Sequence, residues 1–99
     1  MENNLKIYYT PRARETLNSV YQFILQRFGS KSADKFLLKA EKTIALLPKQ
    51  PFMFKASTID ESVRVGFITK QCSLFYQVTE NSIHLLFFWD NRQESTFQV

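Results

Sequence analysis

Apolar positions in this chain follow two different periods, and the change of period separates a helical part from a strand-rich C-terminal third. Near the N-terminus, Leu5, Ile7 and Tyr9 occupy alternate positions, which is typical of a short strand. From about residue 13 to residue 47 the apolar side chains recur every three or four positions, which predicts helix. Alternation and continuous apolar runs follow after residue 62 and predict further strands.

Two helices are predicted within the periodic part. Thr10 is a suitable N-cap, and Pro11 suits the first turn because an N–H at that position has no partner inside the helix. Gly29 is expected to end the first helix, and Ser30 or Ser32 to start the second. Because only two or three residues separate the helices, we expect an antiparallel hairpin.

A connector at residues 48–62 follows the second helix, which Pro48 and Pro51 are expected to end. Its segment 52–54, with the sequence FMF, is too apolar for a free loop and is expected to pack over one edge of the core. We predict a single α+β domain over residues 1–99 with the order β-α-α-β-β-β. An antiparallel helix hairpin packs on a small, mostly antiparallel sheet in this prediction.

Three strands are predicted in the C-terminal third, at about residues 63–69, 73–79 and 82–90. The last of them is apolar on both faces, which indicates an interior strand. One of its faces is expected to pack on the helix hairpin, and an aromatic face left open would be an interaction site. Strict alternation places Ile83, Leu85, Phe87 and Trp89 on one face and Leu86 and Phe88 on the other.

The cysteine content of the chain predicts a protein of a reducing compartment. The chain contains one cysteine, so it cannot form an internal disulfide. The N-terminal residues MENNLKIYY do not resemble a signal peptide, and no apolar run reaches the roughly 18 residues of a membrane span. We therefore expect a cytoplasmic protein that does not interact with membranes.

Charge is distributed unevenly around the formal net charge of +4. Residues 12–55 hold nine basic and three acidic residues, whereas the rest of the chain holds four basic and six acidic residues. A basic surface of this kind attracts polyanions or an acidic protein partner. A solvated, lysine-rich helix face is the alternative interpretation.

Two arginines are candidate site residues in the C-terminal third. Arg64 lies within the first of the three strands, and Arg92 lies two residues past the end of the last one. A guanidinium is a planar, bidentate donor that suits phosphate or carboxylate. The alternatives are a surface turn for Arg92 and, for Arg64, an ion pair with Asp60, Glu61 or Asp90.

Lys49 and Lys55 on the connector would complete an anion-binding pocket if they converge with the two arginines on one face. Each lysine taken alone is more typical of a solvated side chain. His84, in mid-strand, is interpreted as structural, and Cys72 has no partner at metal-ligand spacing. No metal site and no cofactor are predicted.

In their order and spacing these segments resemble the RelE/ParE toxin family of bacterial type II toxin–antitoxin systems. The resemblance extends from KIYYTPRARETL to DNRQESTF and is most specific in VRVGFITKQCSLFYQVTENSIHLLFFWDNRQ. That segment has the family's order of an arginine-bearing strand, a tyrosine-bearing strand, a turn, a strand and a following arginine. The resemblance implies a curved sheet and a cognate antitoxin protein encoded nearby.

The family includes two activities. RelE-like members enter the ribosomal A site and cut mRNA, whereas ParE-like members inhibit DNA gyrase. By position, Arg64 and Arg92 match arginines that stabilise charge on the scissile phosphate in the nuclease members. Lys49 or Lys55 would replace the family's connector lysines. The nuclease members also carry a C-terminal tyrosine or another acid–base group, whereas Phe97 at the comparable position cannot move a proton.

Three functions remain open at this point. The helix lengths and Phe97 favour a ParE-like toxin that arrests bacterial growth by inhibiting gyrase. The alternative is a RelE-like, ribosome-dependent mRNA endonuclease, in which Arg64 and Arg92 would be catalytic. The third is a family member that binds its antitoxin without being toxic.

Overall fold

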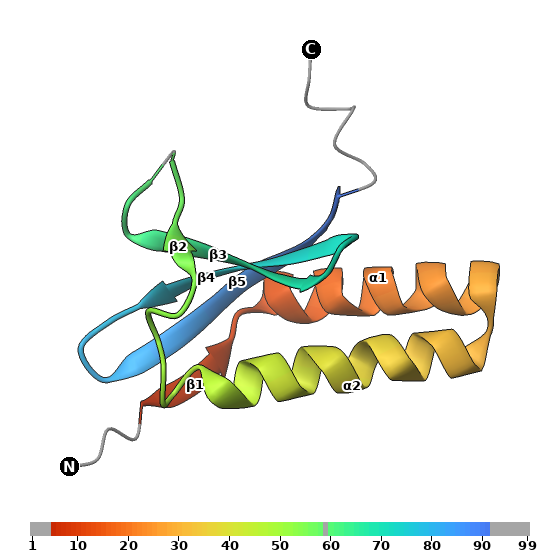
Figure 1. Ribbon diagram of the computed structural model, residues 1–99, viewed down its shortest axis with the longest axis horizontal. Helices are drawn as coiled ribbons and strands as arrows, with labels where there is room; N and C mark the ends of the chain where they lie inside the picture. Colours follow the sequence, from red (N-terminus) through yellow and green to blue (C-terminus); the bar gives the residue numbers. More distant parts are fainter. Residues whose placement is uncertain (1–4, 59, 92–99) are drawn as a thin grey trace.

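The fold is a helix hairpin packed against one face of a five-stranded sheet, as Figure 1 shows for the computed structural model, which describes residues 5–58 and 60–91. This architecture confirms the predicted α+β class. The helices are α1 (Pro11–Phe28) and α2 (Ser30–Leu46). The strands are β1 (Lys6–Tyr9), β2 (Lys55–Ala56), β3 (Val63–Thr69), β4 (Cys72–Val78) and β5 (Ser82–Asp90).

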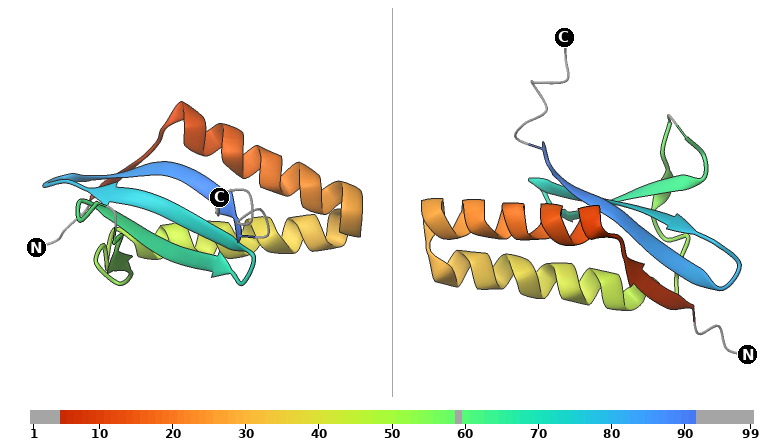
Figure 2. Two further views of the ribbon diagram at one scale, coloured as in Figure 1. Left: turned by 90° about the horizontal axis from the view of Figure 1, so that it is seen from above. Right: turned by 180° about the vertical axis from the view of Figure 1, so that it is seen from behind.

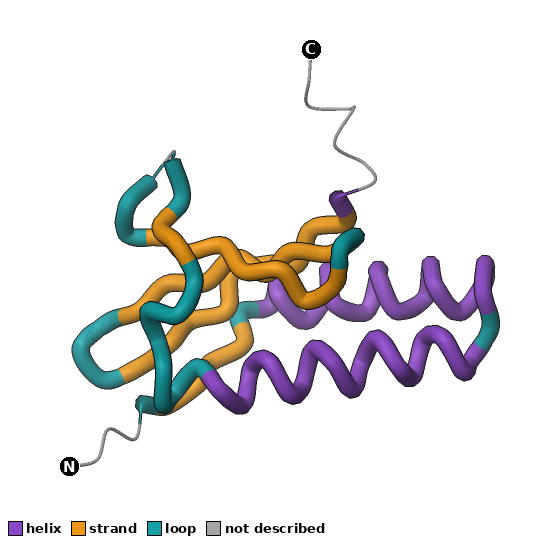
Figure 3. The backbone as a smooth tube through the Cα atoms, viewed as in Figure 1, coloured by secondary structure: helices purple, strands orange, loops and turns teal. Residues whose placement is uncertain are grey.

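The sheet has the order β1-β5-β4-β3-β2, and only the β1–β5 pair among the described strands is parallel. The prediction of an interior last strand is therefore confirmed, because β5 pairs with β1 on one side and β4 on the other. β2 was missed within the predicted connector, since two residues are too few for a period to appear. Figure 3 shows it as a short stretch of strand between loops.

Both ends of α1 are fixed by the residues that the sequence indicated. Thr10 Oγ1 accepts a hydrogen bond of 3.1 Å from the Ala13 N–H and donates one of 2.8 Å to the Leu85 carbonyl in β5. The helix ends at Gly29, whose φ of 95° lies in the left-handed region that glycine adopts without strain. The Gly29 N–H still bonds to the Leu25 carbonyl at 3.0 Å. The tight turn to α2 follows directly.

A β-bulge interrupts the pairing of β4 and β5. Phe75 pairs with Phe87, but the next residue, Tyr76, pairs with Leu85, so Leu86 is the extra residue. An extra residue shifts the alternation of side chains by one position from there onward. Beyond the bulge, each side chain of β5 therefore lies on the face of the sheet opposite to the one that strict alternation assigns to it.

The predicted faces of β5 are wrong beyond Leu85 for this reason. Leu85 and Phe88 are both buried against the helices, whereas strict alternation had placed them on opposite faces. Phe87 and Trp89 are half-buried and lie on the other face by alternation from Phe88. Phe87 stacks there on Phe75, with 4.5 Å between ring centroids.

Helix α1 contacts the edge of β5 beyond the point where β1 ends. β1 pairs with β5 only as far as Tyr9. Beyond that point the Phe88 N–H donates a hydrogen bond of 2.8 Å to Thr16 Oγ1. The Thr16 hydroxyl in turn donates to the Arg12 carbonyl at 2.7 Å. A helix side chain thus replaces a strand partner, and α1 is fixed in place along β5.

The core lies between the hairpin and the sheet. Ala13 and Ala40 are fully buried, so the backbones of the helices approach the neighbouring elements closely at these positions. Neither helix is long and apolar enough to cross a membrane. The core also contains larger side chains from both layers: Val20, Phe36, Ile44 and Leu47 from the helical part, and Ile68, Leu74, Tyr76, Ile83, Leu85 and Phe88 from the strands.

We predict that Thr16→Val destabilises the protein by about 1–3 kcal/mol, because it leaves the Phe88 N–H buried without its acceptor. Thr16→Ser keeps the hydroxyl and serves as the matched control. Urea unfolding followed by the fluorescence of the single tryptophan, Trp89, measures both variants. Equal unfolding midpoints for the two variants would contradict this account of how α1 is attached.

Candidate functional site

Arg64 holds the connector against the sheet. It lies in β3 opposite Tyr76 in β4, so both side chains are on the same face. Its Nη1 donates a hydrogen bond of 2.6 Å to the Phe54 carbonyl, and its guanidinium carbon lies 4.6 Å from the centroid of the Phe52 ring. The half-buried guanidinium therefore contacts two residues of the apolar connector segment.

Tyr76 provides a second attachment for the connector. Its side chain is fully buried, and its hydroxyl donates a hydrogen bond of 3.0 Å to the Pro51 carbonyl. Burial raises the pKa of the Tyr76 phenol, against a smaller opposing effect of the Arg64 charge. Tyr76 therefore remains protonated at neutral pH and acts as a donor.

Gly66 allows the connector to lie directly on β3. A Cβ atom at this position would overlap the Phe54 ring. Phe54 is partly buried against the core and meets Tyr76 edge-on, with 6.4 Å between ring centroids. The prediction that the apolar connector segment packs over the core is thus confirmed for Phe54. Phe52, in contrast, remains 62% exposed.

The predicted anion-binding residues do not all lie together. Lys55 pairs with Val65, and the next residue of β2 pairs with Arg64, so Lys55 and Arg64 lie on opposite faces of the sheet. Lys49 is exposed in the turn after α2. Arg92 lies outside the described residues, as does Phe97. Because Arg92 is outside the described residues, the assignment of Lys49, Lys55, Arg64 and Arg92 to an anion pocket stays a prediction.

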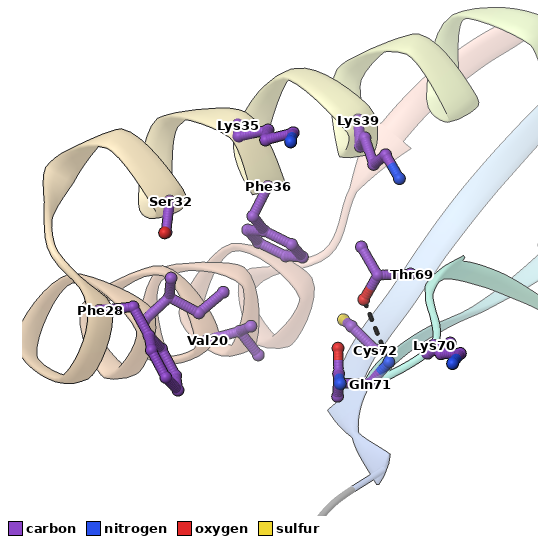
Figure 4. A pocket seen from close by; sticks show the side chains of 11 residues that line it. Val20, Phe28, Ser32, Lys35, Phe36, Lys39, Thr69, Lys70, Gln71 and Cys72 are labelled. Atoms are coloured by element: carbon purple, nitrogen blue, oxygen red, sulfur yellow. Dashed lines mark hydrogen bonds between the residues drawn. The ribbon is translucent and has the colours of Figure 1, made fainter.

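A groove of about 450 Å³ lies between the helix hairpin and the turn that joins β3 to β4. Figure 4 shows Lys35 and Lys39 on α2 and Lys70 on this turn, and it shows the apolar side chains of Val20, Phe28 and Phe36 on the helices. Sequence analysis offered a solvated, lysine-rich helix face as one interpretation of the basic charge, and it gave no reason to bring these lysines close to the turn. The residues lining the groove are Val20, Ile24, Phe28, Ser32, Lys35, Phe36, Lys39 and residues 69–72.

Aromatic pairs cover part of the sheet face opposite the hairpin. Tyr8 of β1 stacks on His84 of β5, with 5.3 Å between ring centroids. His84 Nε2 also lies 2.9 Å from the Ser82 hydroxyl. The histidine is therefore held by a ring and a hydroxyl, in agreement with its interpretation as structural.

Comparison with solved structures shows that the chain has the fold of RelE/ParE toxins. The chain is similar to a chain of the chromosomal ParDE toxin–antitoxin system of P. aeruginosa, with a TM-score of 0.76 and 15% identity over 90% of this chain and 98% of that one. It is also similar to the YoeB dimer of Staphylococcus aureus, with a TM-score of 0.61 and 18% identity over 85% and 93% of the two chains. The E. coli DinJ–YafQ toxin–antitoxin complex matches with a TM-score of 0.63 and 10% identity over 91% and 96%.

The sequence itself identifies the family within this class. The family model for the ParE toxin of the type II toxin–antitoxin system parDE matches residues 7–94. The chain therefore belongs to the ParE toxin family of type II toxin–antitoxin systems. Comparison with curated proteins finds no match.

We predict that Arg64→Ala lowers the free energy of unfolding by about 1–2 kcal/mol, because it removes a charged hydrogen bond and a cation–π contact. Lys55→Ala, from the strand paired with β3, is the control and should change stability by less than about 0.5 kcal/mol. Urea unfolding measures both. If the two variants are equally stable, Arg64 does not hold the connector.

Proposed function

We propose that this protein is a toxin that arrests bacterial growth by binding and inhibiting DNA gyrase. We also propose that an antitoxin encoded nearby neutralises it. The family supports the first part, and the similarity to a chromosomal ParDE toxin–antitoxin system supports the second. On this proposal the chain acts by binding a protein target rather than by cleaving a nucleic acid.

The position of Arg64 is the observation that most favours binding over cleavage. A nuclease site needs guanidinium donors directed at a phosphate, together with a group that moves a proton. One donor of Arg64 is already occupied by the Phe54 carbonyl, and the face of its guanidinium is covered by the Phe52 ring. The nearby Tyr76 hydroxyl is buried and bonded to the Pro51 carbonyl. Both groups thus support the packing of the connector.

An mRNA endonuclease is the second candidate function. Arg64 is half-buried rather than fully enclosed, and the connector residue that covers it, Phe52, is itself largely exposed. Displacement of Phe52 by RNA would free the guanidinium face. Arg64 and Arg92 would then be the catalytic arginines, with Lys49 and Lys55 as candidate RNA contacts.

The prediction from gyrase inhibition is that thymidine incorporation falls before methionine incorporation when the chain is induced in bacteria. Replication fails first in that case, whereas an mRNA endonuclease stops translation first. Pulse labelling with both precursors, at intervals after induction, measures the order. Cells that express the neighbouring antitoxin together with the chain are the control, and both rates should stay normal in them.

Methionine falling first would contradict gyrase inhibition and favour the endonuclease. If neither rate falls while folded protein accumulates, the chain is not an active toxin in that host, which favours a family member that binds its antitoxin without being toxic. A purified-gyrase supercoiling assay then tests the target directly. Addition of the chain should inhibit supercoiling, and addition of the antitoxin should restore it.

A further inference from the structure

The connector carries an exposed apolar tip, formed by Phe52 and Met53. The tip belongs to a turn in which the Met53 N–H donates a hydrogen bond of 3.1 Å to the Gln50 carbonyl. Pro51 occupies the second position of this four-residue turn, where its fixed φ is favourable. Phe52 is 62% exposed and Met53 is 40% exposed. The chain therefore presents two consecutive large apolar side chains at its surface, on a turn that the sequence itself favours.

The turn is bonded to the sheet on both sides of the tip. Before the tip, the Pro51 carbonyl accepts the hydrogen bond of the Tyr76 hydroxyl. After the tip, the Phe54 carbonyl accepts the hydrogen bond of Arg64 Nη1. The Arg64 guanidinium also lies against the ring of Phe52. A tip held in this way does not have to be ordered when a partner binds, which lowers the entropic cost of binding.

The tip and the groove lie at opposite ends of the molecule. Figures 1 and 2 show the connector beside the C-terminal end of α2, whereas the turn at Gly29 lies at the far end of the hairpin. Residues 48–58 are absent from the described lining of the groove, which comes from the helices and from residues 69–72. The tip is therefore a separate surface.

The charges next to the tip are positive. Residues 46–59 include Lys49 and Lys55 but no carboxylate, and both lysines are exposed. The Arg64 guanidinium gives one N–H donor to the Phe54 carbonyl, and its other donors are not used within the described chain. An apolar tip beside cations is complementary to a partner surface that has an apolar pocket bordered by carboxylates.

We propose that this tip is the surface through which the chain binds gyrase. Phe52 and Met53 enter an apolar pocket of gyrase, and carboxylates at the border of that pocket pair with Lys49 and Arg64. The inference rests on the proposed function, to which it adds the residues of the chain that contact the target. Aromatic residues, methionine and arginine are enriched at protein interfaces, and a few such anchors typically provide most of the binding free energy.

Other occupants fit the tip less well. A second copy of the chain in a twofold contact would bring Lys49 and Arg64 close to their own copies, so that like charges repel. A nucleic acid gains most of its affinity from phosphate contacts. Lys55 lies on the opposite face of the sheet from Arg64, which leaves few cations beside the ring of Phe52. A protein with an apolar pocket is the occupant that uses both the apolar tip and its charges.

The experiment measures the affinity of the purified chain for purified gyrase, together with the concentration of chain that halves supercoiling. Phe52→Ala should weaken both by about tenfold or more, because it removes the larger anchor of the tip. Phe67→Ala is the matched control and should leave both unchanged. Phe67 is 67% exposed in β3, and it lies three residues from Arg64 and therefore on the opposite face of the sheet.

Met53→Ala tests the tip without altering its attachments. The bonds to Tyr76 and Arg64 are made by the carbonyls of other residues, and alanine keeps the N–H that closes the turn. We expect this variant to weaken gyrase binding by about threefold or more. Urea unfolding of each variant shows whether it keeps the wild-type fold, so that a loss of binding is not confused with a loss of structure.

Charge reversal tests the border of the tip separately. Lys49→Glu should weaken gyrase binding by about threefold or more and reduce its dependence on salt. Lys31→Glu, at the other end of α2, changes the net charge by the same amount and should leave the affinity unchanged. A photo-crosslinking residue at position 53, but not at position 67, should capture gyrase.

The outcomes separate this inference from the proposed function. A wild-type chain that neither binds gyrase nor inhibits supercoiling would overturn both. Inhibition that Phe52→Ala, Met53→Ala and Lys49→Glu leave unchanged would overturn the role of the tip alone. If gyrase binding is unchanged while Phe52→Ala abolishes a dimer of the chain, the tip belongs to a second copy. If it is unchanged while Lys49→Glu abolishes binding of DNA or RNA, the tip belongs to a nucleic acid.

Discussion

The attachment of α1 to the bulged strand β5 is the constraint on which the rest of the structure depends. Two threonine hydroxyls on the helix side bond to the backbone of β5, Thr10 before the bulge and Thr16 after it. β1 pairs with β5 only up to the same region, so the helix continues an edge that would otherwise expose unpaired backbone groups. The position of α1 sets that of α2 through the tight turn at Gly29, and the hairpin as a whole then covers β4 and β5.

Two surfaces follow from that arrangement. At one end of β3, Arg64, Gly66 and Tyr76 receive the connector, and the ring of Phe54 completes the core there. At the other end, the β3–β4 turn faces helices that extend beyond the sheet, and the apolar stripe of α1 remains partly open. The two helices support the sheet, and because they are long enough to extend beyond it, they also form one side of a groove.

Helix caps and the change of period predicted the elements well because these signals are local. Thr10, Pro11 and Gly29 each act on their own neighbours. The bulge at Leu86 was not predictable from β5 alone, because it is a property of the pairing with β4. The role of Arg64 was missed for a similar reason, since its partners lie ten and twelve residues earlier in a segment without a period. The groove requires knowledge of how far the hairpin extends beyond the sheet, which no single segment contains.

The distance between the two surfaces affects how a loss of toxicity should be interpreted. Arg64 and Lys70 stand six residues apart along β3 and its turn, which corresponds to roughly 20 Å of extended chain. A substitution at Arg64 therefore acts first on the connector and on stability, and not on the groove. If a substitution of Arg64 abolishes toxicity, loss of connector packing is a structural explanation, and it must be excluded before a catalytic role of Arg64 is accepted.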